Sequence, residues 1–236
     1  MKSVPNPMFR DFSLLDFAEK YLSDSEHILF FYLWPQIAIS LGYRQRQGSQ
    51  LREESKAAGL AVSIRPSGGR AVIHGSDICF TFISSQSHKE FGGNLKESYS
   101  KVSNYVLDLI NKYLNENLNL NLKITLSEDS RTSSEYTQEL RKLNPSTNCF
   151  DYLVNGEGCI YHQSKKNKVF GSAQMMHKNF FIQQGSLLVN RLKNIPELSF
   201  RSDTLSLSDI IQSKEFDLND FCDQLNSLSL KPMKGV

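Results

Sequence analysis

Two adjacent glycines, Gly68 and Gly69, lie between two arginines in the stretch from Arg65 to His74. Glycine adopts backbone angles that are closed to other residues, and it lets a ligand approach the main chain closely. Exposed backbone N–H groups and guanidinium groups both donate hydrogen bonds to anions, so this turn could bind a phosphate or a carboxylate. Apolar residues on both sides of the stretch equally fit an ordinary β-hairpin with a Gly-Gly tip. This segment alone leaves both interpretations open.

A lysine, Lys168, stands shortly before the small residues Gly171-Ser172-Ala173. Small residues leave room for a substrate beside the chain, and a lysine can polarise an acyl carbonyl through its charge and its three N–H donors. Most lysines, however, are solvated surface residues, and the residue types alone favour that interpretation here.

A cysteine, Cys149, precedes Phe150 at the end of a long polar segment. A thiol becomes a good nucleophile where nearby cations lower its pKa, and Lys168 and the arginine turn are candidate cations. The alternative is a buried free cysteine that acts as a small apolar residue, which is the commoner case. The other cysteines, Cys79, Cys159 and Cys222, form no CxxC pair. A disulfide framework or a zinc site is therefore not expected, and we predict free thiols and no metal site.

Four stretches taken together resemble the lipoate–protein ligase and octanoyltransferase family, which shares a catalytic fold with biotin–protein ligases. They are Arg65–His74, Cys149-Phe150, Lys168–Gln174 and Gln183–Leu187. The resemblance implies that Lys168 binds the acyl carbonyl and that Cys149 carries the acyl group as a thioester, as in the ligase-like octanoyltransferases. It implies a substrate site formed by Arg65, Ser67, Gly68, Gly69, Arg70, Ala71, His74, Gly171, Ser172, Ala173, Gln184 and Gly185.

The activity that the resemblance implies is octanoyl transfer from acyl carrier protein to the lysine of a lipoyl domain. The acceptors would be the lipoyl domains of 2-oxoacid dehydrogenases or the glycine cleavage H protein, and no cofactor is needed because a thioester supplies the acyl group. One alternative is an ATP-dependent lipoate–protein ligase, which uses ATP and Mg²⁺ to form lipoyl-adenylate. A second alternative is a catalytically silent protein that binds lipoyl domains or acyl groups.

Three positions depart from the family pattern, and two of them, Gln184 and Met176, motivate that second alternative. Arg70 stands where a third glycine is usual, Gln184 where a histidine is usual, and Met176 where an arginine or lysine often follows. Arg70 would narrow the pocket or add a contact to a phosphate.

The elements that must position these residues follow from the apolar patterns along the chain. We expect helices over 12–23, 49–58 and about 99–113, and short helices within 203–229. We expect strands at 27–34, at 37–41 as its return strand, at 77–84 and at 118–126, and then an antiparallel meander from 152 to 182. This pattern predicts an α+β fold without βαβ alternation, a largely antiparallel mixed sheet flanked by helices. The resemblance implies the biotin/lipoyl protein ligase catalytic-domain fold. We expect that domain over residues 1–200 and a short helical extension over 201–236.

The composition fits a soluble globular protein, because 39% of the 236 residues are apolar and 22% are charged. A net charge of +2 gives no strong signal for nucleic acid or membrane partners. No apolar run approaches the roughly 20 residues of a membrane span, and the N-terminus lacks the apolar core of a signal peptide. We therefore expect a cytoplasmic protein.

Overall fold

The computed structural model describes residues 7–45, 50–120, 122–128, 149–151, 156–193, 204–212 and 215–230. Its larger sheet has six strands in the order β1-β5-β9-β8-β7-β6, and every neighbouring pair is antiparallel. These strands are β1 (His27–Tyr32), β5 (Asp77–Ser85), β6 (Thr125–Leu126), β7 (Gly158–His162), β8 (Lys165–His177) and β9 (Phe180–Leu188). The predicted α+β class and the meander through β7, β8 and β9 are confirmed.

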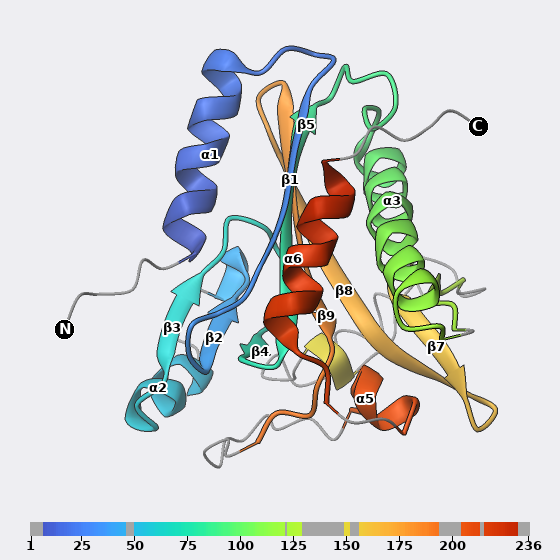
Figure 1. Cartoon of the computed structure of the whole chain (residues 1–236). Helices are drawn as coiled ribbons and strands as arrows, with labels where there is room; N and C mark the ends of the chain where they lie inside the picture. The colour runs from blue at the N-terminus through green and yellow to red at the C-terminus, as the bar shows by residue number, and fades with distance from the viewer. Residues whose placement is uncertain are drawn as a thin grey trace.

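A smaller sheet holds three strands in the order β3-β2-β4. They are β2 (Ala38–Leu41), β3 (Ala61–Ile64) and β4 (Val72–His74). The helices are α1 (Pro7–Tyr21), α2 (Gln50–Ala57), α3 (Leu95–Glu116), α5 (Leu207–Ile210) and α6 (Leu218–Ser229), with short 3-10 turns η1 (Tyr43–Gln45) and η2 (Cys149–Asp151). Figure 1 shows α1, the smaller sheet and α2 to the left of the large sheet, α3 to its right and α6 in front.

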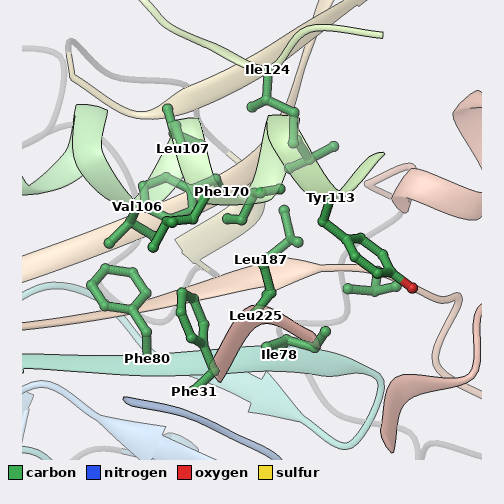
Figure 2. Close-up of a cluster of buried hydrophobic side chains, with 14 of the residues drawn as sticks. Phe31, Ile78, Phe80, Val106, Leu107, Tyr113, Ile124, Phe170, Leu187 and Leu225 are labelled. Atoms are coloured by element: carbon green, nitrogen blue, oxygen red, sulfur yellow. The ribbon is translucent and has the colours of Figure 1, made fainter. Parts of the chain in front are cut away.

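The main core lies between the large sheet and the helices α3 and α6. Apolar residues of α3 recur every three or four positions, so Val102, Val106 and Ile110 share one buried face. They pack against Phe80 of β5 and Phe170 of β8, whose rings stack with centroids 5.6 Å apart (Figure 2). Burial of this face fixes α3 on the sheet.

Side chains on β5 alternate between that core and the opposite face of the sheet, as strand geometry requires. Phe80 and Phe82 point toward α3 and α6, whereas Cys79 packs with Trp34 next to the smaller sheet. On the same face as Cys79, Thr81 donates a hydrogen bond to Asp11 of α1. Asp77, Cys79 and Thr81 of β5 therefore lie on the side where α1 and the smaller sheet lie.

The structure excludes the hairpin interpretation of the glycine turn. Both β3 and β4 pair with β2, which lies between them, and β3 runs parallel to β2. The segment 65–71 is thus a loop that passes over the end of β2, because a seven-residue connection is long enough to reach the strand beyond a neighbour.

Two related predictions are also wrong. The segment 37–41 is not the return strand of β1, because β2 joins the smaller sheet, where Ile39 and Leu41 pack with Ala71 and Ile73. The chain from β2 through α2 to the parallel strand β3 is a βαβ unit, although the sequence pattern favoured none.

The strand expected over 118–126 is reduced to the two residues of β6. Asparagine side chains of α3 explain the difference. The Asn111 amide exchanges hydrogen bonds of 2.9 and 2.8 Å with the backbone of Ile124, and Asn115 does the same with Leu122 at 3.1 Å each. These amides bind backbone groups that a neighbouring strand would otherwise occupy.

The two C-terminal helices pack into the same core as the sheet. Leu207 of α5 and Phe221 and Leu225 of α6 are fully buried in that core, and Asn226 exchanges hydrogen bonds with the backbone of Phe31 on β1.

The division of the chain at residue 200 stays a prediction. The polar segment 129–148 and the strand expected near 152–154 lie outside the described residues. None of the helices in the described part of the chain combines the length and apolar character that a membrane crossing needs.

Candidate active site

A cavity of about 290 Å³ lies where the two sheets meet, beside the loop 65–71. It is lined by most of the predicted site residues, namely Cys149, Lys168, Arg65, Gly69, Arg70, His74, Gly171, Ser172, Ala173, Gln184 and Gly185. Ser67, Gly68 and Ala71 are not part of its lining. Sequence reasoning missed other residues that line it, namely Tyr32, Ser40, Cys79, Glu157 and Ser186. Segments far apart in the chain thus converge on one space.

Cys149, Glu157 and Lys168 form one polar group on the cavity wall, here called the lysine cluster. The Lys168 Nζ donates hydrogen bonds of 2.5 Å to a Glu157 carboxylate oxygen and to the Cys149 carbonyl oxygen. The same nitrogen lies 3.5 Å from the Cys149 Sγ. The Lys168 and Glu157 side chains are only 2% and 7% exposed. Lys168 is therefore not the solvated surface residue that its type alone favoured.

Local backbone structure brings the members of the lysine cluster together. The backbone N–H of Cys149 donates to the Ala71 carbonyl, which ties η2 to the end of the glycine loop. Lys168 on β8 pairs with Cys159 on β7, and the pairing shifts register next to Gly158. Such a bulge turns the bulged strand locally and redirects side chains, and Glu157 lies at this point. The sequence carries no motif that marks Glu157.

Room beside the cluster depends on Gly171. A Cβ atom at that position would lie 3.2 Å from the Lys168 Cε and 3.6 Å from the Cys149 Sγ. The glycine thus keeps space next to the thiol and the ammonium, as the expectation about small residues requires.

A second polar group, here called the histidine cluster, consists of Ser40, His74, Asp77, Cys79 and Ser186. The His74 ring bridges Asp77 and Ser40 with hydrogen bonds of 2.7 Å at each nitrogen. Ser186 and Cys79 donate to the same Asp77 oxygen at 2.5 and 3.2 Å. The indole of Trp34 stacks on His74 with ring centroids 4.5 Å apart. The cluster therefore satisfies its own polar groups and is held from one face by an aromatic ring.

Electrostatics in the histidine cluster favour a charged Asp77 and a protonated Cys79. Burial raises the pKa of the Asp77 carboxyl, but the His74 charge and the hydrogen bonds from His74, Ser186 and Gly75 outweigh it, so this pKa lies below its ordinary value. Burial and the Asp77 charge raise the pKa of the Cys79 thiol well above its ordinary value. Cys79 is therefore a poor nucleophile.

The same atoms have a spacing that could hold a metal ion. The ligand atoms of His74, Asp77 and Cys79 lie within 4.8 Å of one another. Each of them is already hydrogen-bonded inside the cluster. Hydrogen bonding alone accounts for their proximity.

Arg65 holds the glycine loop through its guanidinium. It donates to the carbonyl oxygens of Ser40, Gly68 and Arg70, and to the Ser40 hydroxyl at 3.1 Å. Burial lowers the pKa of this guanidinium, although an arginine stays charged. The hydrogen bonds of Arg65 thus go to the protein, and its positive charge faces the cavity near Cys149.

Glycine is required at two places in this loop region. Gly69 has a φ of +88°, which side chains rarely adopt. A Cβ at Gly42 would lie 2.1 Å from the Gly69 carbonyl oxygen. The loop therefore packs directly against the backbone at the end of β2.

Gln184, which replaces the usual histidine of the pattern, is fixed on both sides of its amide. Its oxygen accepts a hydrogen bond of 2.7 Å from the Ser67 hydroxyl, and its nitrogen donates 2.5 Å to Asp11 of α1. Ser67 thus acts behind the lining, and α1 contributes to the site through Asp11. Among nearby apolar residues, Val72 lines the cavity, whereas Phe80, Phe82 and Phe170 belong to the core.

Comparisons with known proteins give consistent results. The family model of the lipoyl protein ligase A/B catalytic domain matches residues 12–227. Octanoyltransferase LipM of Brevibacillus brevis is 30% identical over 167 residues, covering 68% of this chain and 53% of that protein. Octanoyltransferase LipM of Carboxydothermus hydrogenoformans is 28% identical over 163 residues, covering 69% and 53%. The chain spans about half the length of these curated relatives.

A solved structure shows the same fold. It is described as a bipartite lipoate protein ligase and its E2 lipoyl domain from Thermoplasma acidophilum, with a TM-score of 0.55 and 16% identity, covering 95% of this chain and 79% of that chain. At this identity the likeness concerns the fold.

Proposed function

Because the chain belongs to the lipoyl protein ligase A/B catalytic-domain family, we propose that it is an acyltransferase that attaches octanoyl or lipoyl groups to the lysine of lipoyl domains. The acceptors are the lipoyl domains of 2-oxoacid dehydrogenases or the glycine cleavage H protein, and the donor is octanoyl acyl carrier protein. The relatives named octanoyltransferase support the reaction class. The observation that carries the proposal is the Cys149 thiol, 3.5 Å from the Lys168 ammonium on a cavity wall that Gly171 leaves open.

In the first step the Cys149 sulfur attacks the carbonyl carbon of the donor thioester. A new carbon–sulfur bond forms, the carrier's thiol leaves with a proton, and the enzyme holds the octanoyl group. The Lys168 ammonium donates to the carbonyl oxygen as negative charge develops on it, which lowers the barrier.

In the second step the ε-amine of the acceptor lysine attacks the enzyme thioester. An amide forms, the Cys149 thiol is regenerated, and no cofactor is consumed because one thioester is exchanged for another before the amide forms. The other predicted lining residues are proposed to bind the substrates, with Arg70 facing the phosphate of the carrier's phosphopantetheine arm.

Intact-mass analysis with octanoyl acyl carrier protein tests this proposal. We expect one octanoyl adduct that hydroxylamine removes, and transfer of the octanoyl group to an added lipoyl domain. Absence of the adduct, or an adduct that survives in Cys149→Ala, would contradict the thioester mechanism.

A second arm with free lipoate, ATP and Mg²⁺ separates a transferase from a ligase. Arg70 fills the position where the family pattern has a third glycine, so we expect no joining of lipoate to the lipoyl domain. ATP-dependent lipoylation by the unaltered protein would establish the ligase reaction instead.

A further inference from the structure

We propose that Glu157 is a positioning residue that keeps the Lys168 ammonium charged and in place while Cys149 carries the acyl group. The inference rests on the proposed function for its role in the reaction. The coupling among Glu157, Lys168 and Cys149 on which it depends stands on the geometry alone.

The contacts of Lys168 are the first step of the argument. An ammonium has three N–H donors, and three acceptors of the described residues surround it, namely the Glu157 carboxylate, the Cys149 carbonyl and the Cys149 sulfur. The carboxylate and the carbonyl, at 2.5 Å, are the close ones. The sulfur, at 3.5 Å, is the loosest of the three, so it is the contact that a substrate carbonyl oxygen can replace.

The charges around the cluster are the second step. Arg65 adds a positive charge from the glycine loop, near Cys149. Tyr99 of α3 donates a hydrogen bond to the Ser172 carbonyl, and burial, with the Glu157 and Cys149 charges, raises the pKa of its hydroxyl above the ordinary value, so Tyr99 stays neutral. Among the described groups that face Lys168, Glu157 supplies the carboxylate. A buried ammonium without an anion is costly, so this carboxylate stabilises the charged lysine.

The two chemical steps depend on Glu157 to different extents. During attack on the donor, the Cys149 thiolate is a second anion beside Lys168. Once Cys149 is a neutral thioester, that anion is gone, and Glu157 is the anion that still contacts the ammonium among the described groups. Loss of Glu157 should therefore slow transfer to the acceptor lysine much more than formation of the acyl-enzyme.

Alkylation of Cys149 by iodoacetamide tests the coupling without any acyl substrate. In Glu157→Gln, a charged Lys168 beside a protonated thiol has no carboxylate to compensate its charge. The thiolate can then supply the missing negative charge, so the Cys149 thiol loses its proton at lower pH. We expect the midpoint of the alkylation rate against pH to fall by about one unit or more, a shift typical of close charges. Peptide mass spectrometry assigns the label to Cys149 rather than to Cys79.

Two further variants separate charge from packing. Glu157→Asp keeps the charge and should retain a midpoint close to that of the unaltered protein. Glu19→Gln removes a carboxylate of α1 from an ion pair with Lys178 in the turn between β8 and β9, outside the cavity lining, and should change nothing. A midpoint in Glu157→Gln that equals the unaltered one, in a protein whose circular dichroism is native, would overturn the inference.

Single-turnover kinetics test the role in the reaction. We expect octanoyl-enzyme formation in Glu157→Gln to change little and its transfer to the lipoyl domain to slow by roughly a hundredfold, as when an oxyanion donor is lost. Equal slowing of both steps would overturn the positioning role. If the unaltered protein forms no octanoyl adduct, the proposed function fails, and the alkylation midpoint alone decides whether Glu157 controls the cluster.

Discussion

The two polar clusters of the cavity differ in whether their contacts change during the proposed reaction. In the lysine cluster, Lys168 contacts the Cys149 sulfur, which gains and loses the acyl group. In the histidine cluster, His74 hydrogen-bonds to Asp77 and Ser40, which take no part in that transfer. Both clusters contain a carboxylate, a basic side chain and a thiol, and all of these groups are buried except Cys149, which is partly exposed. The Asp77–His74–Ser40 series even has the hydrogen-bond order of a serine-hydrolase triad. Ser40, however, is 1% exposed and also accepts from Arg65.

The difference shows that residue types alone do not identify chemistry. A nucleophile needs space for a substrate and a neighbouring charge that can respond to it. Gly171 supplies that space beside Cys149, whereas in the other cluster Trp34 stacks on His74 and the polar side chains hydrogen-bond one another. We therefore propose the lysine cluster as the reactive group, and support of the loop and sheets as the main role of the histidine cluster.

The largest expected effect comes from replacing the Cys149 thiol, with replacement of the Cys79 thiol as the matched control. Cys149→Ala should abolish the octanoyl adduct, whereas Cys79→Ala should still form it, because the raised pKa of the Cys79 thiol keeps it protonated at neutral pH. Intact-mass spectrometry after incubation with octanoyl acyl carrier protein measures both. An adduct on Cys79 would reverse the assignment of the two clusters.

Loss of the lysine should have the next largest effect. Lys168→Ala should lose about 2–4 kcal/mol of transition-state stabilisation, as with other oxyanion donors. Lys168→Arg should restore little activity, because a planar guanidinium does not replace a compact ammonium between Glu157 and Cys149. Steady-state kcat/KM gives the loss, and near-normal turnover in Lys168→Ala would show that the ammonium takes no part.

The histidine cluster should affect stability more than turnover. Asp77→Asn places an amide N–H₂ among groups that donate to the carboxylate, and should reduce the free energy of unfolding by about 1–3 kcal/mol at neutral pH. Since folding lowers the pKa of Asp77, its contribution is present above its unfolded pKa of about 3.9 and is lost as pH falls through the lower folded value.

Urea unfolding at several pH values measures this contribution. The difference between the unaltered protein and Asp77→Asn should be greatest near pH 7 and should narrow below about pH 4. A difference that is constant with pH would mean that the Asp77 charge does not stabilise the fold.

The smallest expected effect concerns Arg70, which lines the cavity at the edge of the glycine loop. Arg70→Gly should weaken the use of octanoyl acyl carrier protein mainly through KM, because a contact to a remote phosphate is equal in the ground and transition states. A change confined to kcat would place Arg70 in the chemistry of the lysine cluster.

Local sequence patterns predicted the helices and most strands correctly, because period and capping are properties of neighbouring residues. The apolar stripe of α3 and the meander through β7, β8 and β9 are examples. Strand pairing was predicted poorly where it involves distant segments. No local pattern predicts that β2 lies between β3 and β4. The same holds for the hydrogen bond from the Ile124 backbone to the Asn111 side chain.

The sequence by itself determined the family motifs, and through them the candidate residues Cys149 and Lys168. Only the tertiary structure decided what surrounds each of them. Glu157 reaches Lys168 across a register shift between two strands, and Arg65 directs its donors to oxygens of its own loop and of Ser40 on β2. The physical reason is that the charge and reactivity of a buried group depend on its neighbours within a few ångströms, and those neighbours come from remote parts of the chain that only folding brings together.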